Sequence, residues 1–392
     1  MDRPLLNRRL AAFGTTIFAE MSALAQRTGS INLGQGFPDA DGPEEVREAA
    51  VRALRDGRGN QYPPGPGIPE LRTAVAAHQQ RFYGHRGLSY DPDTEVLVTA
   101  GATEALAASL LALLEPGDEV VALEPYYDSY AAGIAMAGGR RVPVTLRPSA
   151  ETGTYHLDLD EFRDALTDKT RLILLNTPHN PTGTVLSRDE LAAIAALAVE
   201  RDLLVVADEV YEHLVFEGEH LPIASFPGMR ERTVTISSAG KTFSFTGWKV
   251  GWVTAAPELI SAVRSAKQFL TYVSAGPFQY AVAEALALPD AYFTGLRDDL
   301  RTKRDILATG LADAGFGVFR PAGTYFITTD IRPLGETDGF AFCRALPERA
   351  GVVAIPNAVF YDHQDQGAPF VRFAFCKGTA VLQEAAGRLK RL

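Results

Sequence analysis

Cysteine is scarce in this sequence: only Cys343 and Cys376 occur among 392 residues, and both lie in apolar surroundings. Two isolated thiols of this kind are typical of a protein from a reducing compartment. The first residues also lack the apolar core of a signal peptide, and no apolar run reaches the length that spans a membrane. We therefore expect a cytoplasmic protein without a membrane-spanning segment.

Basic residues are in deficit, with 38 Lys and Arg against 48 Asp and Glu and a net charge of −10. Binding to nucleic acid or to an anionic membrane needs a cationic face, so this balance argues against both kinds of partner. At 46% hydrophobic and 22% charged residues the chain has the composition of a soluble globular protein. Its length favours two domains, or one large domain with a satellite.

Short apolar runs alternate with helical patterns between residues 95 and 255. Strands are expected at 95–99, 119–123, 141–146, 171–176, 203–208, 233–237 and 249–255. Helices are expected between them at 102–114, 127–137, 159–166 and 188–201. Nearly continuous Val, Leu and Ile strands separated by helices predict an α/β core with a mostly parallel seven-stranded sheet that is covered by helices.

The rest of the chain predicts a smaller α+β domain. Helices are expected at 257–270, 277–288, 289–314, 339–346 and 379–389, and shorter strands at 325–331, 352–355 and 370–376. The first 45 residues hold one short helix and a Gly/Pro-rich run. We predict an N-terminal arm with part of the small domain at 1–45, a large domain at 46–289 and the small C-terminal domain at 290–392.

Lys241 lies in a turn of small residues, 237–243, that directly follows an apolar strand. Amine chemistry on a carbonyl group needs a lysine near its neutral form, and partial burial beside a second cation lowers the lysine pKa. Lys249 could be that cation. A surface-loop lysine explains the local motif equally well.

The ends of the predicted strands carry further candidates, because ligands collect at the carboxyl ends of parallel strands. Residues 100–104 are small and lead into a helix, which suits a phosphate, although many such turns only connect elements. Tyr127 follows the next strand and could offer its face to a planar ligand, or could pack against the sheet edge.

Three more polar side chains follow buried strands. Asn180 lies in a rigid turn with two prolines and a glycine, which could aim its amide inward. Asp208 ends a strand that should be buried on both faces, and a buried carboxylate needs a partner or becomes neutral. Tyr211 follows by three residues, so both side chains could meet one ligand.

Arg372 lies in the alternating segment 370–376 and shares its face with Phe370, Ala374 and Cys376. A guanidinium on so apolar a face needs an anionic partner, and its two parallel donors match a carboxylate. The alternative is an edge-strand arginine that reaches solvent. Taken together, the strand ends provide an imine-forming lysine, a buried acid, a phosphate cradle, an aromatic plate, an amide and a carboxylate clamp. This set indicates a pyridoxal-phosphate site, in which the acid keeps the pyridine nitrogen protonated.

Six segments resemble the class I and II aminotransferases of pyridoxal-phosphate fold type I. They are 31–39 (INLGQGFPD), 60–67 (NQYPPGPG), 176–183 (NTPHNPTG), 208–214 (DEVYEHL), 237–252 (SSAGKTFSFTGWKVGW) and 371–377 (VRFAFCK). The similarity spans nearly the whole chain and is greatest to the kynurenine/glutamine/methionine aminotransferases and the actinobacterial N-succinyldiaminopimelate aminotransferases. It implies the fold of that family, its cofactor pyridoxal 5′-phosphate and no metal among the site residues.

The resemblance also implies a role for individual residues at the cofactor. Lys241 would hold the cofactor, Asp208 would pair with the pyridine nitrogen, and Tyr211 would hydrogen-bond the ring hydroxyl together with Asn180. Tyr127 would stack on the ring. The phosphate would be held by Ala102, Thr103, Ser238 and Lys249. Much of the wider family has Arg in place of Lys249, and a lysine there is a mark of the kynurenine-type branch.

The same resemblance implies how substrates bind. Arg372, with Asn180 and the backbone at Gly36, would hold the substrate carboxylate. Tyr62 would reach into the site of a neighbouring subunit, so a homodimer is implied. Tyr62, Phe37 and Tyr130 hint at an aromatic or otherwise sizeable pocket, although core packing explains each of them as well.

The predicted activity is transfer of an amino group between an L-amino acid and a 2-oxo acid by a ping-pong mechanism. A carbon-sulfur β-lyase acting on cysteine conjugates is the alternative, because it uses the same kind of site. A transcription factor with an aminotransferase-like domain would need a DNA-binding module before residue 30. A nucleotide-binding enzyme would need Gly-x-Gly-x-x-Gly after the first strand, and this motif is missing.

Overall fold

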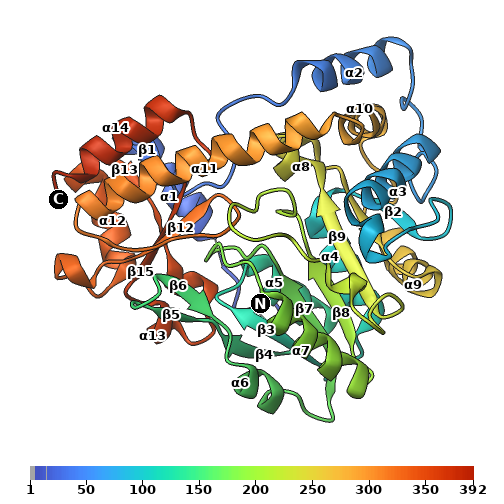
Figure 1. Cartoon of the computed structure of the whole chain (residues 1–392), viewed down its shortest axis with the longest axis horizontal. Helices are drawn as coiled ribbons and strands as arrows, with labels where there is room; N and C mark the ends of the chain where they lie inside the picture. Colours follow the sequence, from blue (N-terminus) through green and yellow to red (C-terminus); the bar gives the residue numbers. More distant parts are fainter. Residues whose placement is uncertain (1–4, 15) are drawn as a thin grey trace.

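The structure is a computed structural model that describes residues 5–14 and 16–392. A seven-stranded sheet covered by helices occupies one part of the molecule, and a smaller group of strands and helices lies beside it (Figure 1). None of the helices in the described ranges is long and apolar enough to cross a membrane.

The large sheet has the strand order β2-β10-β9-β8-β7-β3-β4. Its strands in chain order are β2 (Val96–Thr99), β3 (Glu119–Glu124), β4 (Arg140–Thr145), β7 (Thr170–Asn176), β8 (Leu204–Asp208), β9 (Thr233–Ser238) and β10 (Gly251–Thr254). Only β10 runs antiparallel to its neighbours in this sheet. The predicted mostly parallel seven-stranded sheet is therefore confirmed.

Helices cover both faces of this sheet, and the residues of β7 show how. Ile173 and Leu175 pack in one apolar cluster with α6 (Leu159–Asp164) and α7 (Arg188–Glu200). Leu172 and Leu174 point to the opposite cluster, which contains α4 (Gly101–Leu113), α5 (Asp128–Ala137) and α9 (Pro257–Lys267). Alternation along a strand that is buried on both sides explains why its sequence is continuously apolar.

A further helical layer packs near β2 and β10. It comprises α2 (Glu44–Arg55), α3 (Pro69–Tyr83) and α10 (Gly276–Leu286). The one-turn helix α8 (Ala239–Thr242) directly follows β9. The short 3₁₀ helices are η1 (Gly84–Arg86), η2 (Ile223–Ser225), η3 (Thr246–Trp248), η4 (Arg332–Leu334) and η5 (Asn357–Phe360).

The C-terminal part contains an antiparallel sheet with the order β11-β12-β15-β14. The strands are β11 (Gly317–Phe319), β12 (Phe326–Asp330), β14 (Ile355–Pro356) and β15 (Phe370–Ala374), and the helices are α11 (Asp290–Asp313), α12 (Gly339–Ala350), α13 (Gln364–Gly367) and α14 (Thr379–Leu389). The sequence prediction missed β11 and the hairpin of β5 (Arg147–Ser149) and β6 (Thr154–His156). The predicted strand 352–355 is two short strands in different sheets, β13 (Val352–Val353) and β14.

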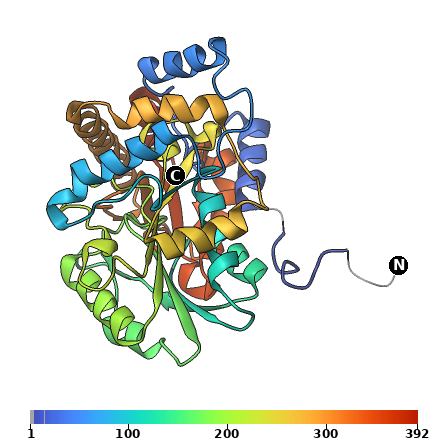
Figure 2. The same cartoon turned by 90° about the vertical axis from the view of Figure 1, so that its right-hand side faces the viewer.

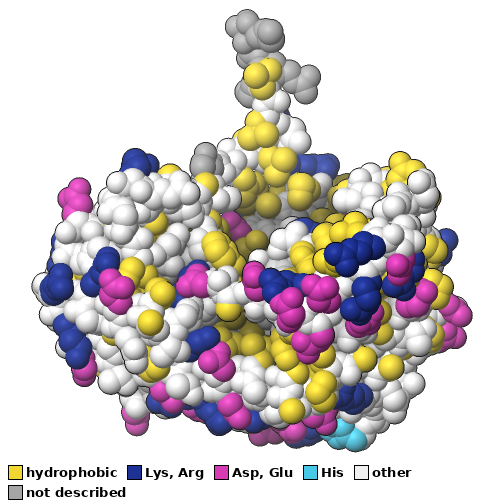
Figure 3. Space-filling model, turned by 90° about the horizontal axis from the view of Figure 1, so that it is seen from above, with side chains coloured by type: hydrophobic (Ala, Val, Ile, Leu, Met, Phe, Trp, Pro, Cys, Tyr) yellow, Lys and Arg dark blue, Asp and Glu magenta, His cyan; other side chains and the backbone are white. Residues whose placement is uncertain are grey.

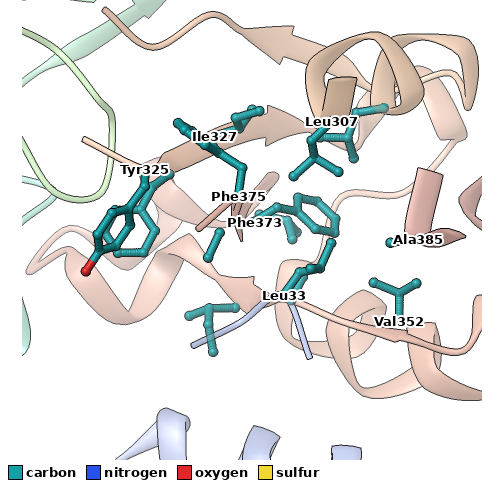
Figure 4. Packing of buried hydrophobic residues seen from close by; sticks show 14 of the residues in the cluster. Leu33, Leu307, Tyr325, Ile327, Val352, Phe373, Phe375 and Ala385 are labelled. Carbon is teal, nitrogen blue, oxygen red and sulfur yellow. The ribbon is translucent and has the colours of Figure 1, made fainter. Parts of the chain in front are cut away.

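The N-terminal region joins this C-terminal part. After α1 (Ile17–Thr28), β1 (Ile31–Asn32) pairs in parallel with β13. Leu33 then enters the apolar core between Phe373, Phe375 and Val352 (Figure 4). Before α1, the described chain projects from the body of the molecule (Figure 2), and Arg9 donates a hydrogen bond to the carbonyl of Met136 over 3.1 Å. The division into domains at residues 45 and 289 stays a prediction.

Candidate active site

A cavity of about 290 Å³ lies where the ends of β8 and β9 meet the start of α4 and the C-terminal sheet. The molecule is hollowed near the middle of the face seen in Figure 3, where hydrophobic side chains gather. All but one of the site residues that the sequence predicts line the cavity. These are Gly36, Ala102, Thr103, Tyr127, Asn180, Asp208, Tyr211, Ser238, Lys241, Lys249 and Arg372.

Lys241 extends from α8 into this cavity. Its Nζ atom lies 5.7 Å from the ring centre of Tyr211 and 5.6 Å from that of Tyr325. The pKa of Lys241 is lowered to about 8, mainly through desolvation by burial; Asp208 raises it, and the cations Arg372 and Lys249 lower it. The alternative of a solvated surface lysine is therefore wrong, and burial contributes more to the shift than the expected second cation.

Asp208 ends β8 with its carboxylate buried at the cavity. The hydroxyl of Tyr130 donates to its Oδ2 atom over 2.7 Å, and the backbone N–H of Val210 approaches Oδ1 at 3.3 Å. Desolvation raises the pKa of Asp208 to about 6, while these hydrogen bonds and the charge of Lys241 act in the opposite direction. The buried acid thus has the partners that its position at a strand end demanded.

Asn176 connects the end of β7 to this acid. Its Nδ2 donates to the backbone carbonyl of Asp208 over 2.9 Å, and its Oδ1 accepts from the backbone N–H of Asn180 over 2.7 Å. One side chain therefore fixes both the strand end that bears the acid and the turn that bears Asn180.

Arg372 lies on β15 between β12 and β14 and is 1% exposed. Its guanidinium donates to Oδ1 of Asn180 over 2.8 Å and to the carbonyl of Gly34 over 3.0 Å. It also lies 4.0 Å from the ring centre of Phe326. Burial lowers its pKa to about 10. The alternative of an edge-strand arginine in solvent is wrong, because β15 is an inner strand.

The other end of the cavity is built from backbone and a cation. Gly101 begins α4 with φ +76°, and a Cβ at this position would lie 3.2 Å from Nζ of Lys249. A Cβ on Gly251 would lie 2.7 Å from the backbone of Gly101. Free backbone N–H groups at the start of a helix and a nearby ammonium are features that suit an anion.

Tyr62 is the one predicted site residue that does not line the cavity. It is 81% exposed and meets Tyr272 edge to ring, with ring centres 5.6 Å apart. Phe269 is also 84% exposed in the adjoining loop. We call these three exposed side chains the aromatic loop residues (Tyr62, Phe269 and Tyr272).

Several cavity residues were not assigned a place in the site from the sequence. They include Phe18, Gln35, Asn176, Phe245 and Phe326. Gln35 donates to the carbonyl of Phe18 over 3.1 Å and to the hydroxyl of Ser22 over 2.7 Å, which ties α1 to the cavity wall. Asn176 and Gln35 belong to segments that carry the family resemblance, so their position in those segments was the available signal.

The described residues fit pyridoxal 5′-phosphate. Nε of Arg372 is buried without a hydrogen-bond partner among them. Gly101 and Gly251 approach each other too closely for a Cβ, at the start of α4 where backbone N–H groups can bind a phosphate. Asp208 offers a buried carboxylate to a ring nitrogen, and Lys241 offers an amine in the same cavity.

Comparison with known proteins agrees with this geometry. Residues 28–389 match the family described as aminotransferase class I and II. The chain is 54% identical over 393 residues to a probable N-succinyldiaminopimelate aminotransferase of Mycobacterium tuberculosis, with 98% of each chain covered. It is 39% identical over 397 residues to the methionine aminotransferase of Escherichia coli, with both chains covered completely, at 100%.

The fold agrees as well. The solved structure of N-succinyldiaminopimelate aminotransferase from Mycobacterium tuberculosis superposes with a TM-score of 0.95 at 55% identity and covers 98% of this chain and 99% of the other. These matches confirm the resemblance inferred from the motifs. The chain therefore belongs to the class I and II aminotransferases and is a transaminase that depends on pyridoxal 5′-phosphate.

Proposed function

We propose that this transaminase uses Lys241 to move a proton at the substrate α-carbon, and that its amino donor is an N-succinyl-diaminopimelate with 2-oxoglutarate as acceptor. The observation that carries the first part is the lysine with a pKa of about 8 in one cavity with Asp208 and Arg372. The amino donor rests on the name of the 54% identical relative, which matches over 98% of its length, and the acceptor rests on a 38% identical relative named kynurenine–oxoglutarate transaminase.

At the cofactor, each residue has a distinct task. Lys241 would form the covalent link, and Asp208 would pair with the pyridine nitrogen. Tyr211 and Asn180 would hydrogen-bond the ring hydroxyl, and Tyr127 would stack on the ring. The phosphate would be held by Ala102, Thr103, Ser238 and Lys249. When bound, pyridoxal 5′-phosphate supplies an electrophilic carbon and a ring that accepts electrons.

At the substrate, Arg372 binds the α-carboxylate with both arms of its guanidinium. Its hydrogen bond to Asn180 and its contact with Gly34 fix the plane of the fork before substrate arrives. Pre-orientation of this kind lowers the entropy that is lost on binding. Asn180 and the backbone at Gly36 complete the contact with the carboxylate.

The amine of Lys241 would take the proton from the substrate α-carbon, hold it at Nζ and later give it up again. A pKa of about 8 suits both steps near neutral pH, because a useful fraction of the amine is neutral and its conjugate acid can still donate. The enzyme returns to its starting state only after a second substrate, the 2-oxo acid, has reacted. The first product leaves before that, so we expect ping-pong kinetics.

The distal carboxylates of the proposed donor need a cation beyond those of this cavity. Among the described lining residues the cationic side chains are Lys241, Lys249 and Arg372, and each already has a task. We infer a homodimer in which the partner subunit completes the site, with Tyr62 of one chain reaching the cavity of the other. The exposed aromatic loop residues support this, because large exposed rings favour a protein interface. The buried, unpaired thiols of both cysteines support a cytoplasmic location.

A panel of donors and acceptors with the purified holoenzyme tests the proposal. We expect N-succinyl-diaminopimelate with 2-oxoglutarate to give a higher kcat/KM than kynurenine, methionine or glutamine. A preference for methionine or kynurenine would contradict the assigned substrate, although the protein would still be a transaminase. Pyruvate and sulfide released from a cysteine conjugate without an amino acceptor would instead indicate a β-lyase.

A further inference from the structure

A cluster of metal-ligating side chains lies outside the cavity. His78 belongs to α3, and Glu212 and His213 follow β8. One ligand atom from each lies within 4.8 Å of the other two, and among the described residues this is the one such group of three. His78 and Glu212 are buried, whereas His213 is partly exposed.

The two imidazole rings face each other through their Nε2 atoms, which are 2.8 Å apart. Nδ1 of His78 lies 3.3 Å from the carbonyl of Leu286. A carbonyl only accepts, so Nδ1 carries the ring proton and Nε2 of His78 presents a lone pair to the cluster. A histidine that ligates a metal commonly donates its other ring N–H to a backbone carbonyl in this way.

The carboxylate of Glu212 is held in place by hydrogen bonds. Its Oε2 accepts from the hydroxyl of Tyr83 over 2.8 Å, and its Oε1 accepts from the hydroxyl of Ser237 over 2.7 Å. Each oxygen has two acceptor sites, so each keeps one for a further contact. Such second-sphere bonds orient a carboxylate ligand.

We propose that His78, Glu212 and His213 bind one Zn²⁺ ion. Two imidazole nitrogens and one carboxylate oxygen are a donor set that zinc prefers, and water from the side of His213 completes four ligands. Zn–N bonds of about 2.0–2.1 Å at a tetrahedral angle place the two nitrogens roughly 3.3 Å apart. The rings must therefore move apart by about 0.5 Å, and the proton of His213 moves to Nδ1, so the ring stays neutral.

The two imidazole rings lie between two phenylalanines. Phe82 has its ring centre 4.6 Å from that of His78 and 4.7 Å from that of His213, and Phe293 lies 5.4 and 4.6 Å from the same two rings. The nearby cation is Arg81, whose guanidinium is paired with Asp290 and lies over the ring of Phe82 at 5.0 Å. Glu212 supplies the negative charge that a divalent cation needs.

The position of this site suggests a structural effect on the active site. Glu212 directly follows Tyr211, and Ser237 directly precedes Ser238, and both neighbours line the cavity. A bound ion would join α3 to the chain at the ends of β8 and β9. We therefore expect zinc to stabilise the fold, whether or not the proposed substrate is correct.

The test uses tag-free holoenzyme that is treated with a chelator, dialysed and titrated with Zn²⁺. Calorimetry and elemental analysis should give one zinc per chain, and thermal unfolding should shift upward. His213→Ala removes a partly exposed ligand and should weaken binding by about tenfold or more. Glu212→Gln keeps the shape and should weaken it too. His156→Ala, at an exposed histidine on β6, is the control and should bind as the wild type.

Bound Co²⁺ provides a second readout, because its visible spectrum reports the geometry of nitrogen and oxygen ligands. Equal zinc stoichiometry and affinity in the wild type and in His213→Ala would overturn the proposal, as would a wild type that binds no zinc. Either result would identify the two rings as a hydrogen-bonded histidine pair only. Retained cofactor absorbance in both variants shows that they are folded.

Discussion

The hydroxyl of Tyr130 donates a hydrogen bond to Oδ2 of Asp208 over 2.7 Å, and both side chains are buried. Tyr130 lies in α5 and Asp208 at the end of β8, so the bond joins a helix that covers the sheet to a strand of the sheet. Since the tyrosine donates to the ionised carboxylate, it keeps the pKa of Asp208 lower than burial alone would.

Tyr130→Phe tests this relationship. Loss of the donor should raise the pKa of Asp208 above about 6, so a smaller fraction is ionised at neutral pH. The acid limb of the kcat/KM profile should move to higher pH, and kcat/KM at pH 7 should fall about tenfold, as expected for one hydrogen bond to a charged group. Tyr155→Phe, a buried tyrosine outside the cavity, is the control. An unchanged acid limb in Tyr130→Phe would show that the bond does not tune the acid.

Arg372→Lys tests the carboxylate clamp. The substitution keeps a positive charge and removes the planar fork that Asn180 and Gly34 hold in position. We expect KM for the amino acid and for the oxo acid to rise about ten- to a hundredfold, with a smaller change in kcat. Steady-state kinetics with both substrates measures this, and Arg344→Ala at an exposed ion pair is the control. Unchanged KM values would remove Arg372 from the substrate site.

Lys241→Met should stabilise the protein without cofactor. The folded state lowers the pKa of this lysine to about 8, so below that pH the fold must hold a charged amine that the unfolded chain solvates freely. Between about pH 8 and pH 10 the unfolded chain binds more protons, so wild-type stability rises with pH through that window. The free energy of unfolding of the variant should therefore exceed that of the wild type by about 3 kcal/mol at pH 7, and by less at pH 9.5.

Denaturant unfolding of the cofactor-free proteins measures this difference. Lys267→Met is the informative contrast, because Lys267 is also buried but donates to the carbonyls of Gly65 and Tyr272 over 3.2 and 2.5 Å. That variant should lose stability. If the Lys241→Met protein is less stable than the wild type at pH 7, the buried amine of Lys241 does not destabilise the cofactor-free fold, and the prediction is wrong.

Mixed dimers test the shared site. We expect Lys241→Ala and Tyr62→Ala each to be impaired as homodimers. When the two chains are co-expressed, one site of each mixed dimer combines an intact Lys241 with an intact Tyr62 of the partner. Activity should therefore reappear in the purified mixed dimer. Activity no higher than that of the Tyr62→Ala homodimer would mean that Tyr62 serves its own chain or none.

Most of the sheet could be predicted from the sequence because strands such as β7 and β8 are continuously apolar. Asn180, Asp208 and Lys241 lie at or just after the ends of β7, β8 and β9, and all three line the cavity. The antiparallel direction of β10 could not be predicted, since an apolar run has the same pattern in either direction. The bond between Tyr130 and Asp208 was missed because it depends on how α5 packs on the sheet. The contact of His78 with His213 joins residues 135 positions apart, and no local pattern indicates such a pair.

The most direct test of the central claim is to reduce the holoenzyme with borohydride, digest it and map the peptides by mass spectrometry. The reduction makes the link between cofactor and protein permanent. We predict that the phosphopyridoxyl mass appears on Lys241 and that Lys249, in the same cavity, stays unmodified. The mass on Lys249 or on any other lysine, or no stable modification of the active protein, would contradict the assignment of Lys241.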